Sequence, residues 1–147
     1  MSAVRRADAV WSGALASGSG VVSASTSHTF SDLPVSWASR TEAADGRTSP
    51  EELVAAAHAS CFAMALSGAL ARAGTPPERL DVSAEVTFDK LDAGWRVVSS
   101  ALTVVGVVPG MSEDDFLVAA TGARDGCPIS QALKGNVALS VDATLRS

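Results

Sequence analysis

Cysteine and histidine are scarce in this sequence. Its 147 residues include two of each, and neither a C-x-x-C nor an H-x-x-x-H pair occurs. Zinc fingers, zinc ribbons and related sites need such closely spaced ligands. We therefore expect no metal and no cofactor. The two cysteines, Cys61 and Cys127, are either inert core thiols or a redox pair.

Clustered positive charge is also absent. The chain carries 11 basic and 16 acidic residues, for a formal net charge of −5, and it has no run of lysines and arginines. Proteins that bind nucleic acid neutralise its phosphates with a clustered basic face. We therefore expect no nucleic-acid partner.

Long uninterrupted apolar runs are missing, although 47% of the residues are hydrophobic. No stretch reaches the roughly 18 consecutive apolar residues of a membrane span, and no long apolar segment follows Arg5 and Arg6 as in a signal peptide. We expect a cytoplasmic protein with no membrane partner, in a compartment where lasting disulfides are rare. Because the composition is apolar for a chain of this size, some of the apolar surface is expected between subunits.

Two common functional motifs are not found. The G-x-S-x-G elbow of serine hydrolases is absent, and the glycines of the segment 18–20 (GSG) are followed by neither the lysine nor the helix of a phosphate loop. A hairpin turn is the better interpretation of these glycines.

Residues 49–74 form the strongest predicted helix. Ser49 is a good N-cap, Pro50 suits the first helical position, and Glu52 completes a capping box with Ser49. Gly74, which a Thr-Pro-Pro run follows, supplies the stop. The interior is almost all Ala, Leu, Met and Phe, so we expect the helix to be central and apolar nearly all round.

Alternating apolar patterns on both sides of this helix predict strands, including two hairpins. The predicted strands are 8–15, 18–25, 33–37, 80–90, 94–108 and 136–145. Two shorter helices are expected at 112–123 and 127–135, and a partly extended connection carries Arg40. The order predicts one α+β domain over residues 1–147, with a mostly antiparallel sheet and a buried central helix.

The two cysteines differ in their local setting. Taken alone, Cys61 is better explained as packing, because a cysteine in an Ala-rich helix commonly acts as a small buried hydrophobe. Cys127 comes just before Pro128, which holds it extended at the start of a predicted helix. Free amides and the helix dipole there favour a thiolate and lower the pKa of the thiol. Cys127 is therefore better suited to reaction than to packing.

Four further side chains are candidates to assist these sulfurs. His58 lies one helical turn before Cys61, and both thiolate chemistry and an ordinary hydrogen bond to backbone or water remain open for it. Glu51 is not used by the capping box. Its carboxylate either interacts favourably with the helix dipole in the first turn or has a functional role. Arg40 and Arg47 precede the helix and are surface charges unless an anion holds them.

The sequence resembles the OsmC/Ohr family, which comprises osmotically induced proteins and organic hydroperoxide resistance proteins. The shared motifs cover nearly the whole chain. They are W-S-G at Trp11, G-S-G at Gly18, SPEELVAAAHASCFAMALS from Ser49, DKLDAGW from Asp89, V-P-G at Val108 and GCPISQALK from Gly126. Two of these motifs are specific, and together they favour the OsmC branch.

This resemblance implies a cofactor-free, thiol-dependent peroxidase that reduces organic hydroperoxides and, in the OsmC branch, hydrogen peroxide. It also implies an intertwined homodimer with both cysteines in the site, and a dithiol reductant, which is of the lipoyl type in the Ohr branch. Cys61 matches the peroxidatic cysteine, Cys127 the resolving cysteine and Glu51 the family glutamate. Arg40 is our choice for the family arginine. Arg47 competes with it, because GRTSPEEL has an extra residue relative to the expected G-T-N-P-E form.

The spacing of Glu51 and Cys61 leads to a hypothesis about assembly. Ten residues of one helix separate them by roughly 15 Å, which is too far for one site. Glu51 therefore acts through a long arginine or serves the Cys61 of a partner chain. Antiparallel pairing of two such helices about a twofold axis would give each site residues of both chains.

A second class of function stays open at this point. The composition also fits an apolar dimeric module that binds a ligand or plays a structural part under stress, with both cysteines as core thiols. If the chain is a peroxidase, the candidates for the apolar lining of its site are Phe62, Met64, Phe116 and the segment 30–37. Core thiols would stay reduced under mild peroxide, whereas a working pair would form a disulfide.

Overall fold

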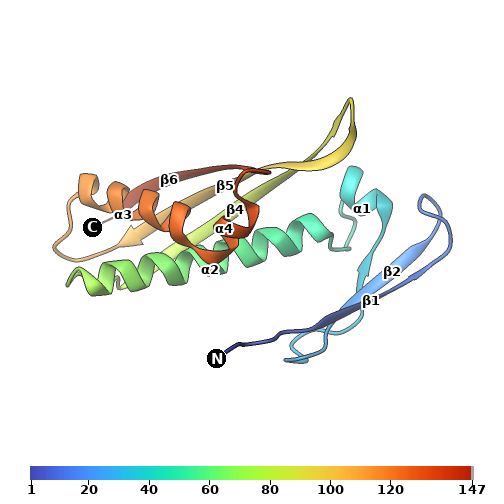
Figure 1. Cartoon of the computed structure of the whole chain (residues 1–147), viewed down its shortest axis with the longest axis horizontal. Coiled ribbons are helices and arrows are strands. Elements are labelled where there is room, and N and C mark those ends of the chain that lie inside the picture. Colours follow the sequence, from blue (N-terminus) through green and yellow to red (C-terminus); the bar gives the residue numbers. More distant parts are fainter. Residues whose placement is uncertain (147) are drawn as a thin grey trace. The chain divides into compact units, whose positions relative to one another are not determined.

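A computed structural model describes residues 1–146 of the chain. It divides into two compact units, Met1–Leu53 and the residues from Val54 onward. Figure 1 shows the helices and strands of each unit, coloured along the chain. Their mixture confirms the predicted α+β class, while a single domain over residues 1–147 stays a prediction.

The first unit begins with the predicted hairpin. Strands β1 (Ala7–Ser12) and β2 (Ser19–Ala24) pair antiparallel, and β3 (Leu33–Val35) adds to the other side of β2. Trp11 lies directly over Gly20, since a Cβ at Gly20 would come 2.7 Å from the Trp11 ring. The glycine is therefore needed because the indole of the neighbouring strand fills its side-chain space.

A short helix, α1 (Trp37–Thr41), replaces part of the extended connection expected there. Ser36 and Ser39 form a capping box, in which each hydroxyl accepts a hydrogen bond from the other residue's backbone N–H at 3.1 Å. These two reciprocal bonds fix the helix start within a polar segment. The connection is thus extended only at β3, the helix was not predicted, and Arg40 lies on the last turn of α1.

The central predicted helix is confirmed as α2 (Pro50–Arg72). The Ser49 hydroxyl accepts a hydrogen bond from the Glu52 N–H at 3.1 Å, whereas the Glu52 carboxylate accepts one from the Thr48 hydroxyl at 2.7 Å. The helix ends at Gly74, which has a φ of 85°, and Thr75 N–H donates to the Leu70 carbonyl. This is a Schellman motif, so a glycine in the left-handed region ends the helix as predicted.

One edge of α2 is buried in the described chain. It consists of residues four apart, His58, Phe62, Leu66 and Leu70, each at most 1% exposed. On another side Met64 is 70% exposed. By length and composition α2 is able to cross a membrane, but the core helix of a soluble protein meets the same criterion. The apolar residues of the buried edge belong to the core of the second unit.

The second unit contains a three-stranded sheet. Strands β4 (Arg79–Leu91) and β5 (Gly94–Val107) form the predicted hairpin, and β6 (Ala138–Arg146) pairs with β5 in parallel. This parallel pair is an exception to the expected antiparallel pattern. It arises because the helices between β5 and β6 return the chain to the same end of the sheet. The described strands form two separate sheets, β1-β2-β3 and β4-β5-β6, where the sequence predicted one sheet.

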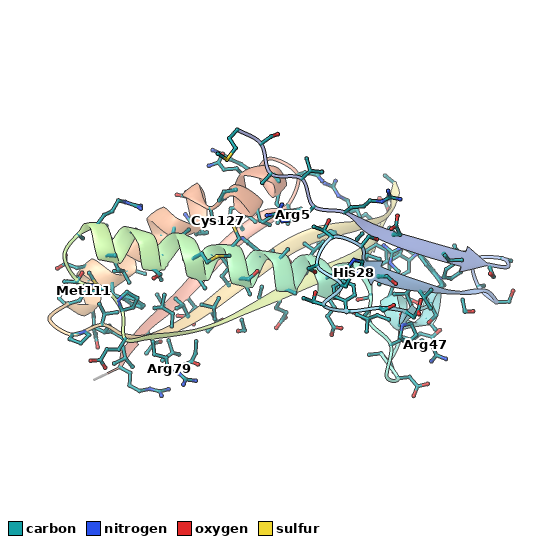
Figure 2. The ribbon with its side chains drawn as sticks, turned by 90° about the horizontal axis from the view of Figure 1, so that it is seen from below. Arg5, His28, Arg47, Arg79, Met111 and Cys127 are labelled. Carbon is teal, nitrogen blue, oxygen red and sulfur yellow. The ribbon has the colours of Figure 1, made fainter. Side chains whose placement is uncertain are left out.

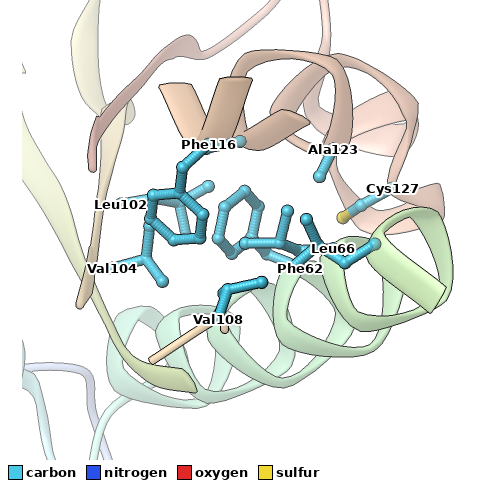
Figure 3. Close-up of a cluster of buried hydrophobic side chains, with 10 residues drawn as sticks. Phe62, Leu66, Leu102, Val104, Val108, Phe116, Ala123 and Cys127 are labelled. Atoms are coloured by element: carbon cyan, nitrogen blue, oxygen red, sulfur yellow. The ribbon is translucent and has the colours of Figure 1, made fainter. Parts of the chain in front are cut away.

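Helix α3 (Glu113–Gly126) and helix α4 (Pro128–Leu133) make that return. Helix α3 begins at the predicted N-cap Ser112, whose hydroxyl accepts a hydrogen bond from Asp115 N–H at 3.2 Å. Its Phe116 ring packs on β5 at Gly106, where a Cβ would come 2.5 Å from the ring. Figure 3 shows Phe116 in the core beside Phe62 of α2 and Leu102 of β5. The core of this unit thus lies between α2, α3 and the sheet.

Candidate active site

Cys127 joins two helices. It is the C-cap of α3 and the N-cap of α4, with the extended conformation expected before Pro128 (ψ 135°). Its side chain is fully buried and points into the core (Figure 3). The sulfur accepts hydrogen bonds from the Ser130 backbone N–H at 3.3 Å and from the Ser130 hydroxyl at 3.4 Å. Two donors on one sulfur are the contacts that stabilise a thiolate.

Cys61 lies on α2 and contacts this arrangement. It is partly buried and packs against the hydrophobic cluster that contains Cys127. Both cysteines are free thiols. The structure therefore brings together the two cysteines that the sequence singled out, at the start of α4.

The two thiols are shifted in opposite directions. Burial raises the pKa of the Cys61 thiol, the Ile129 N–H only partly offsets this, and the neighbouring Cys127 raises the pKa further. Burial also raises the pKa of Cys127, but the hydrogen bonds from Ser130, Cys61 and Ile129 outweigh burial and hold that pKa below its usual range. Within one reduced chain the thiolate is therefore favoured on Cys127.

His58 is buried and links three elements. Its Nδ1 lies 2.6 Å from the Ser100 hydroxyl oxygen on β5, and its Nε2 lies 2.7 Å from the Ser130 hydroxyl oxygen on α4. Burial lowers the pKa of the His58 imidazole, so the ring is held in its neutral form. The structure gives His58 ordinary hydrogen bonds, as one of the two interpretations from the sequence expected, but to serine side chains. A part in thiolate chemistry stays a prediction.

Ser100 and Ser130 were not among the residues predicted from the sequence, although each has a recognisable signal. Ser130 follows Cys127 by three residues, the spacing at which an N-cap side chain meets a backbone N–H. Ser100 shares a strand face with the buried Leu102 and Val104, and a polar residue at such a position usually has a buried partner.

Arg40 and Glu51 form a second pair, in the first unit. Arg40 Nη2 lies 2.7 Å from Glu51 Oε1, and Arg40 Nε lies 3.2 Å from both carboxylate oxygens. The two side chains are 28% and 8% exposed. The guanidinium also lies over the Trp37 ring, 5.4 Å from its centroid. A bidentate, partly buried pair of this kind fixes the orientation of the arginine.

Arg47 has a different setting. It lies on the connection between α1 and α2 (Figure 2), where Nη1 is 3.5 Å from an Asp45 carboxylate oxygen, and both side chains are more than 40% exposed. Glu51 thus contacts Arg40, not its competitor Arg47. The structure therefore gathers the four predicted residues into two pairs, Cys61 with Cys127 and Arg40 with Glu51, in separate units.

Two of the three aromatic and methionine residues expected to line a substrate site belong to the core. Phe62 and Phe116 are at most 1% exposed and pack in the hydrophobic cluster that also contains Cys127, and their part in lining a substrate site stays a prediction. Within residues 1–146, no group of three or more His, Cys, Asp or Glu side chains is arranged to hold a metal ion.

Comparisons with known proteins agree with the sequence motifs. Residues 43–142 match the family described as OsmC-like protein. Peroxiredoxin OsmC of Escherichia coli is 40% identical over 139 residues, which cover 95% of this chain and 96% of that protein. This chain belongs to the OsmC-like family. The resemblance stated from its motifs is thereby confirmed.

Other relatives of this OsmC-like chain are organic hydroperoxide resistance proteins. One from Staphylococcus epidermidis, named organic hydroperoxide resistance protein-like 2, is 30% identical over 100 residues, or 66% of this chain and 68% of that protein. The crystal structure of an organic hydroperoxide resistance protein from Elizabethkingia anophelis superposes with a TM-score of 0.78 at 22% identity. That match covers 99% of this chain and 100% of the other. The OsmC-like chain therefore shares the fold of that protein.

Proposed function

We propose that this OsmC-like chain is a cofactor-free, thiol-dependent peroxidase of the cytoplasm. It reduces organic hydroperoxides to alcohols and hydrogen peroxide to water. The observation that carries the proposal is that Cys61 packs against the buried cluster that contains Cys127. Relatives named peroxiredoxin and organic hydroperoxide resistance protein support a peroxidase-type role.

The first step oxidises Cys61. Its thiolate attacks one peroxide oxygen, so that a sulfur–oxygen bond forms while the oxygen–oxygen bond breaks, and the departing alkoxide takes a proton to leave as an alcohol. Because burial raises the pKa of Cys61 within one chain, this thiolate needs a cation beside it. Arg40 is the proposed cation, which also stabilises the negative charge on the departing oxygen. Its bidentate bond to Glu51 supports this choice over Arg47.

The second step uses Cys127. Its sulfur attacks the Cys61 sulfenic acid, forming a Cys61–Cys127 disulfide and releasing water before Cys61 can be oxidised further. A dithiol, for which a lipoyl type is proposed, then exchanges with this disulfide and leaves as a disulfide itself. Both protein thiols are thereby restored.

The active unit in this proposal is a homodimer. Glu51 and Cys61 are ten residues apart on the continuous helix α2, a separation of about 15 Å along its axis. Of the two alternatives, a long arginine within one chain or service to the partner chain, we propose that Glu51 and Arg40 serve the Cys61 of the partner chain. The exposed Met64 of α2 supports an apolar contact with a second copy.

The alternative, a ligand-binding or structural module with core thiols, has one observation in its favour, the complete burial of Cys127. The environment of the Cys127 sulfur favours the peroxidase. A core cysteine packs against apolar atoms, whereas this sulfur accepts two hydrogen bonds from Ser130. A lowered pKa for a fully buried thiol fits reaction better than packing.

Single cysteine variants test the proposal. Cys61→Ser is expected to abolish consumption of cumene hydroperoxide, with a loss of at least about 10³-fold in kcat/KM, since the nucleophile is gone. Cys127→Ser is expected to reduce one equivalent of peroxide and then stop with an oxidised Cys61. Both are measured by peroxide consumption with a lipoyl dithiol as reductant, followed by mass spectrometry of the protein.

Exposure of the unaltered protein to mild peroxide provides the companion measurement. An intramolecular Cys61–Cys127 bond is expected, and two thiols that stay reduced would favour the core-thiol alternative. Retention of peroxide consumption by Cys61→Ser would show that the nucleophile is misassigned.

A further inference from the structure

A buried row of hydrogen-bonding side chains ends at the Cys127 sulfur. Ser100 contacts His58 Nδ1 at 2.6 Å, His58 Nε2 contacts Ser130 Oγ at 2.7 Å, and the Ser130 hydroxyl reaches the sulfur at 3.4 Å. All four residues are at most 1% exposed. A proton that leaves the Cys127 thiol therefore meets these side chains before it meets water.

This row accommodates two protonation patterns. With a Cys127 thiol, the sulfur donates to Ser130 Oγ, the Ser130 hydroxyl donates to His58 Nε2, and His58 Nδ1–H donates to Ser100 Oγ. With a Cys127 thiolate, the Ser130 hydroxyl donates to the sulfur and His58 Nε2–H donates to Ser130 Oγ. Passage from the first pattern to the second moves one proton from sulfur to imidazole through the Ser130 hydroxyl.

The position of His58 argues for more than packing. The other members of the buried edge of α2 are Phe62, Leu66 and Leu70, and a further apolar side chain would continue that edge. A buried imidazole instead requires a hydrogen-bond partner for each nitrogen. Two serines from β5 and α4 meet that requirement, and one of them also contacts a reactive sulfur.

We propose that His58, acting through Ser130, accepts the Cys127 proton when Cys127 attacks oxidised Cys61. In that step the sulfur–sulfur bond forms and the Cys61 sulfur–oxygen bond breaks. Cys127 sulfur supplies the electron pair and is oxidised, while the Cys61 sulfur is reduced. The departing hydroxide takes a proton from solvent at the partly exposed Cys61 and leaves as water, and the imidazolium afterwards gives up its proton to solvent, so that protons and charge balance. This step rests on the proposed function, because peroxide must first have oxidised Cys61.

Burial fits a transient role for the imidazolium. A neutral His58 is favoured by its surroundings, so the charged ring gives up its proton readily once hydroxide departs. While charged, the ring has an N–H for each serine oxygen, so neither proton is left without an acceptor. His58 touches neither peroxide nor sulfur in this scheme and is a positioning residue.

The test generates the electrophile on Cys61 without peroxide. Cys61 is partly exposed and Cys127 is buried, so a nitrobenzoate disulfide reagent is expected to form a mixed disulfide at Cys61. Formation of this mixed disulfide releases one thionitrobenzoate, and attack by Cys127 then releases a second. The two releases are followed by absorbance as separate phases in a stopped-flow instrument, and the second phase reports the attack by Cys127. His58→Gln can still donate to Ser130 but cannot take up a proton, and it is expected to slow the second release at least about tenfold. His28→Asn is the matched control, because His28 is exposed and its φ of 56° suits asparagine.

The formation rate of the mixed disulfide at Cys61 separates chemistry from damage to the fold. His58→Gln is expected to leave this first reaction unchanged, whereas a merely structural role would slow both reactions together. Release at the wild-type rate by His58→Gln, or equal slowing of both reactions, overturns the proposal. If His58→Gln does not fold, Ser130→Ala is used; it keeps the backbone N–H bond to Cys127, and slow release is expected. Wild-type release by Ser130→Ala overturns the proposal as well.

A peroxide arm distinguishes this inference from the proposed function. Wild-type protein is treated with one equivalent of cumene hydroperoxide and then alkylated for mass spectrometry. Suppose that peroxide does not oxidise Cys61, but that release of thionitrobenzoate by Cys127 depends on His58. This result rejects the peroxidase function and retains the proton transfer from Cys127 to His58. If peroxide oxidises Cys61 but release of thionitrobenzoate does not depend on His58, only the proton transfer to His58 is rejected.

Discussion

At the scale of single residues, His58 makes folding stability depend on pH. Burial holds the pKa of its imidazole below the ordinary value of about 6.5. Between these two values the unfolded chain binds a proton that the folded chain does not, so stability falls as the pH falls through this window. The slope is up to about 1.4 kcal/mol per pH unit, and the contribution is complete above the ordinary pKa. Urea unfolding at a series of pH values, at one protein concentration, is expected to show a smaller slope for His58→Gln.

The exposed His28 again supplies the control for that measurement. His28→Asn is expected to keep the wild-type slope over the same pH range, since His28 is exposed and this change leaves the buried His58 in place. Equal slopes for wild type and His58→Gln would mean that His58 takes up its proton in the folded protein.

Residue identities were largely accessible from the sequence, but their partners were not. Motifs pointed to Cys61 and Cys127, and the setting before Pro128 indicated the lowered pKa of Cys127. The partners of His58 are 42 and 72 residues away along the chain, and local patterns do not report on contacts at that separation. Whether the assigned residues act as proposed stays a prediction.

At the scale of elements, the contact of α3 with β5 depends on the missing side chain of Gly106. A Cβ there would come 2.5 Å from Phe116 Cζ, and both residues are buried. Gly106→Ala is expected to lower the free energy of unfolding by about 1–3 kcal/mol, because a packed core resists an added methyl group. Chemical denaturation measures this change.

Gly122 provides the opposite case on α3 itself. It is exposed and has no atom within 4 Å of an added Cβ. Gly122→Ala is expected to stabilise the protein by about 0.5–1 kcal/mol, since alanine is the better helix former. A Gly106→Ala variant as stable as wild type would show that α3 moves away from β5 at little cost.

Most elements followed from periodicity and capping signals, and the exceptions have physical causes. Alternation predicts a strand but not the direction of its partner, so the parallel pairing of β6 with β5 was not foreseen. Helix α1 was missed because two serines, Ser36 and Ser39, cap each other in a segment without apolar periodicity. An arginine acting with Glu51 was expected from the sequence, but the helix that carries Arg40 to it was not.

At the scale of the whole molecule, the dimer proposal makes a prediction about mixed chains. Cys61→Ser and Arg40→Ala chains are inactive alone in this scheme. Refolded together, half of the dimers pair one chain of each kind, and each such dimer has one site with an intact Cys61 and the partner's Arg40. Recovery of about a quarter of wild-type peroxidase activity is expected from random pairing.

A mixture that stays inactive would mean that Arg40 serves the cysteine of its own chain. Arg47→Ala is the control, because Arg47 is exposed and contacts Asp45 instead of Glu51. It is expected to keep wild-type activity without mixing. No pattern in one sequence reports which chain supplies an arginine, since both chains carry the same residues.

The position of Arg40 over Trp37 gives the protein an intrinsic optical reporter. The sequence has three tryptophans and no tyrosine, so its fluorescence comes from indole rings alone. Trp37 lies 5.4 Å from the guanidinium of Arg40, whereas Trp95 stacks on Phe88 and Trp11 covers Gly20. A cation over an indole face alters the electronic environment of that ring. Emission from Trp37 therefore follows the proposed cation of the site without any added label.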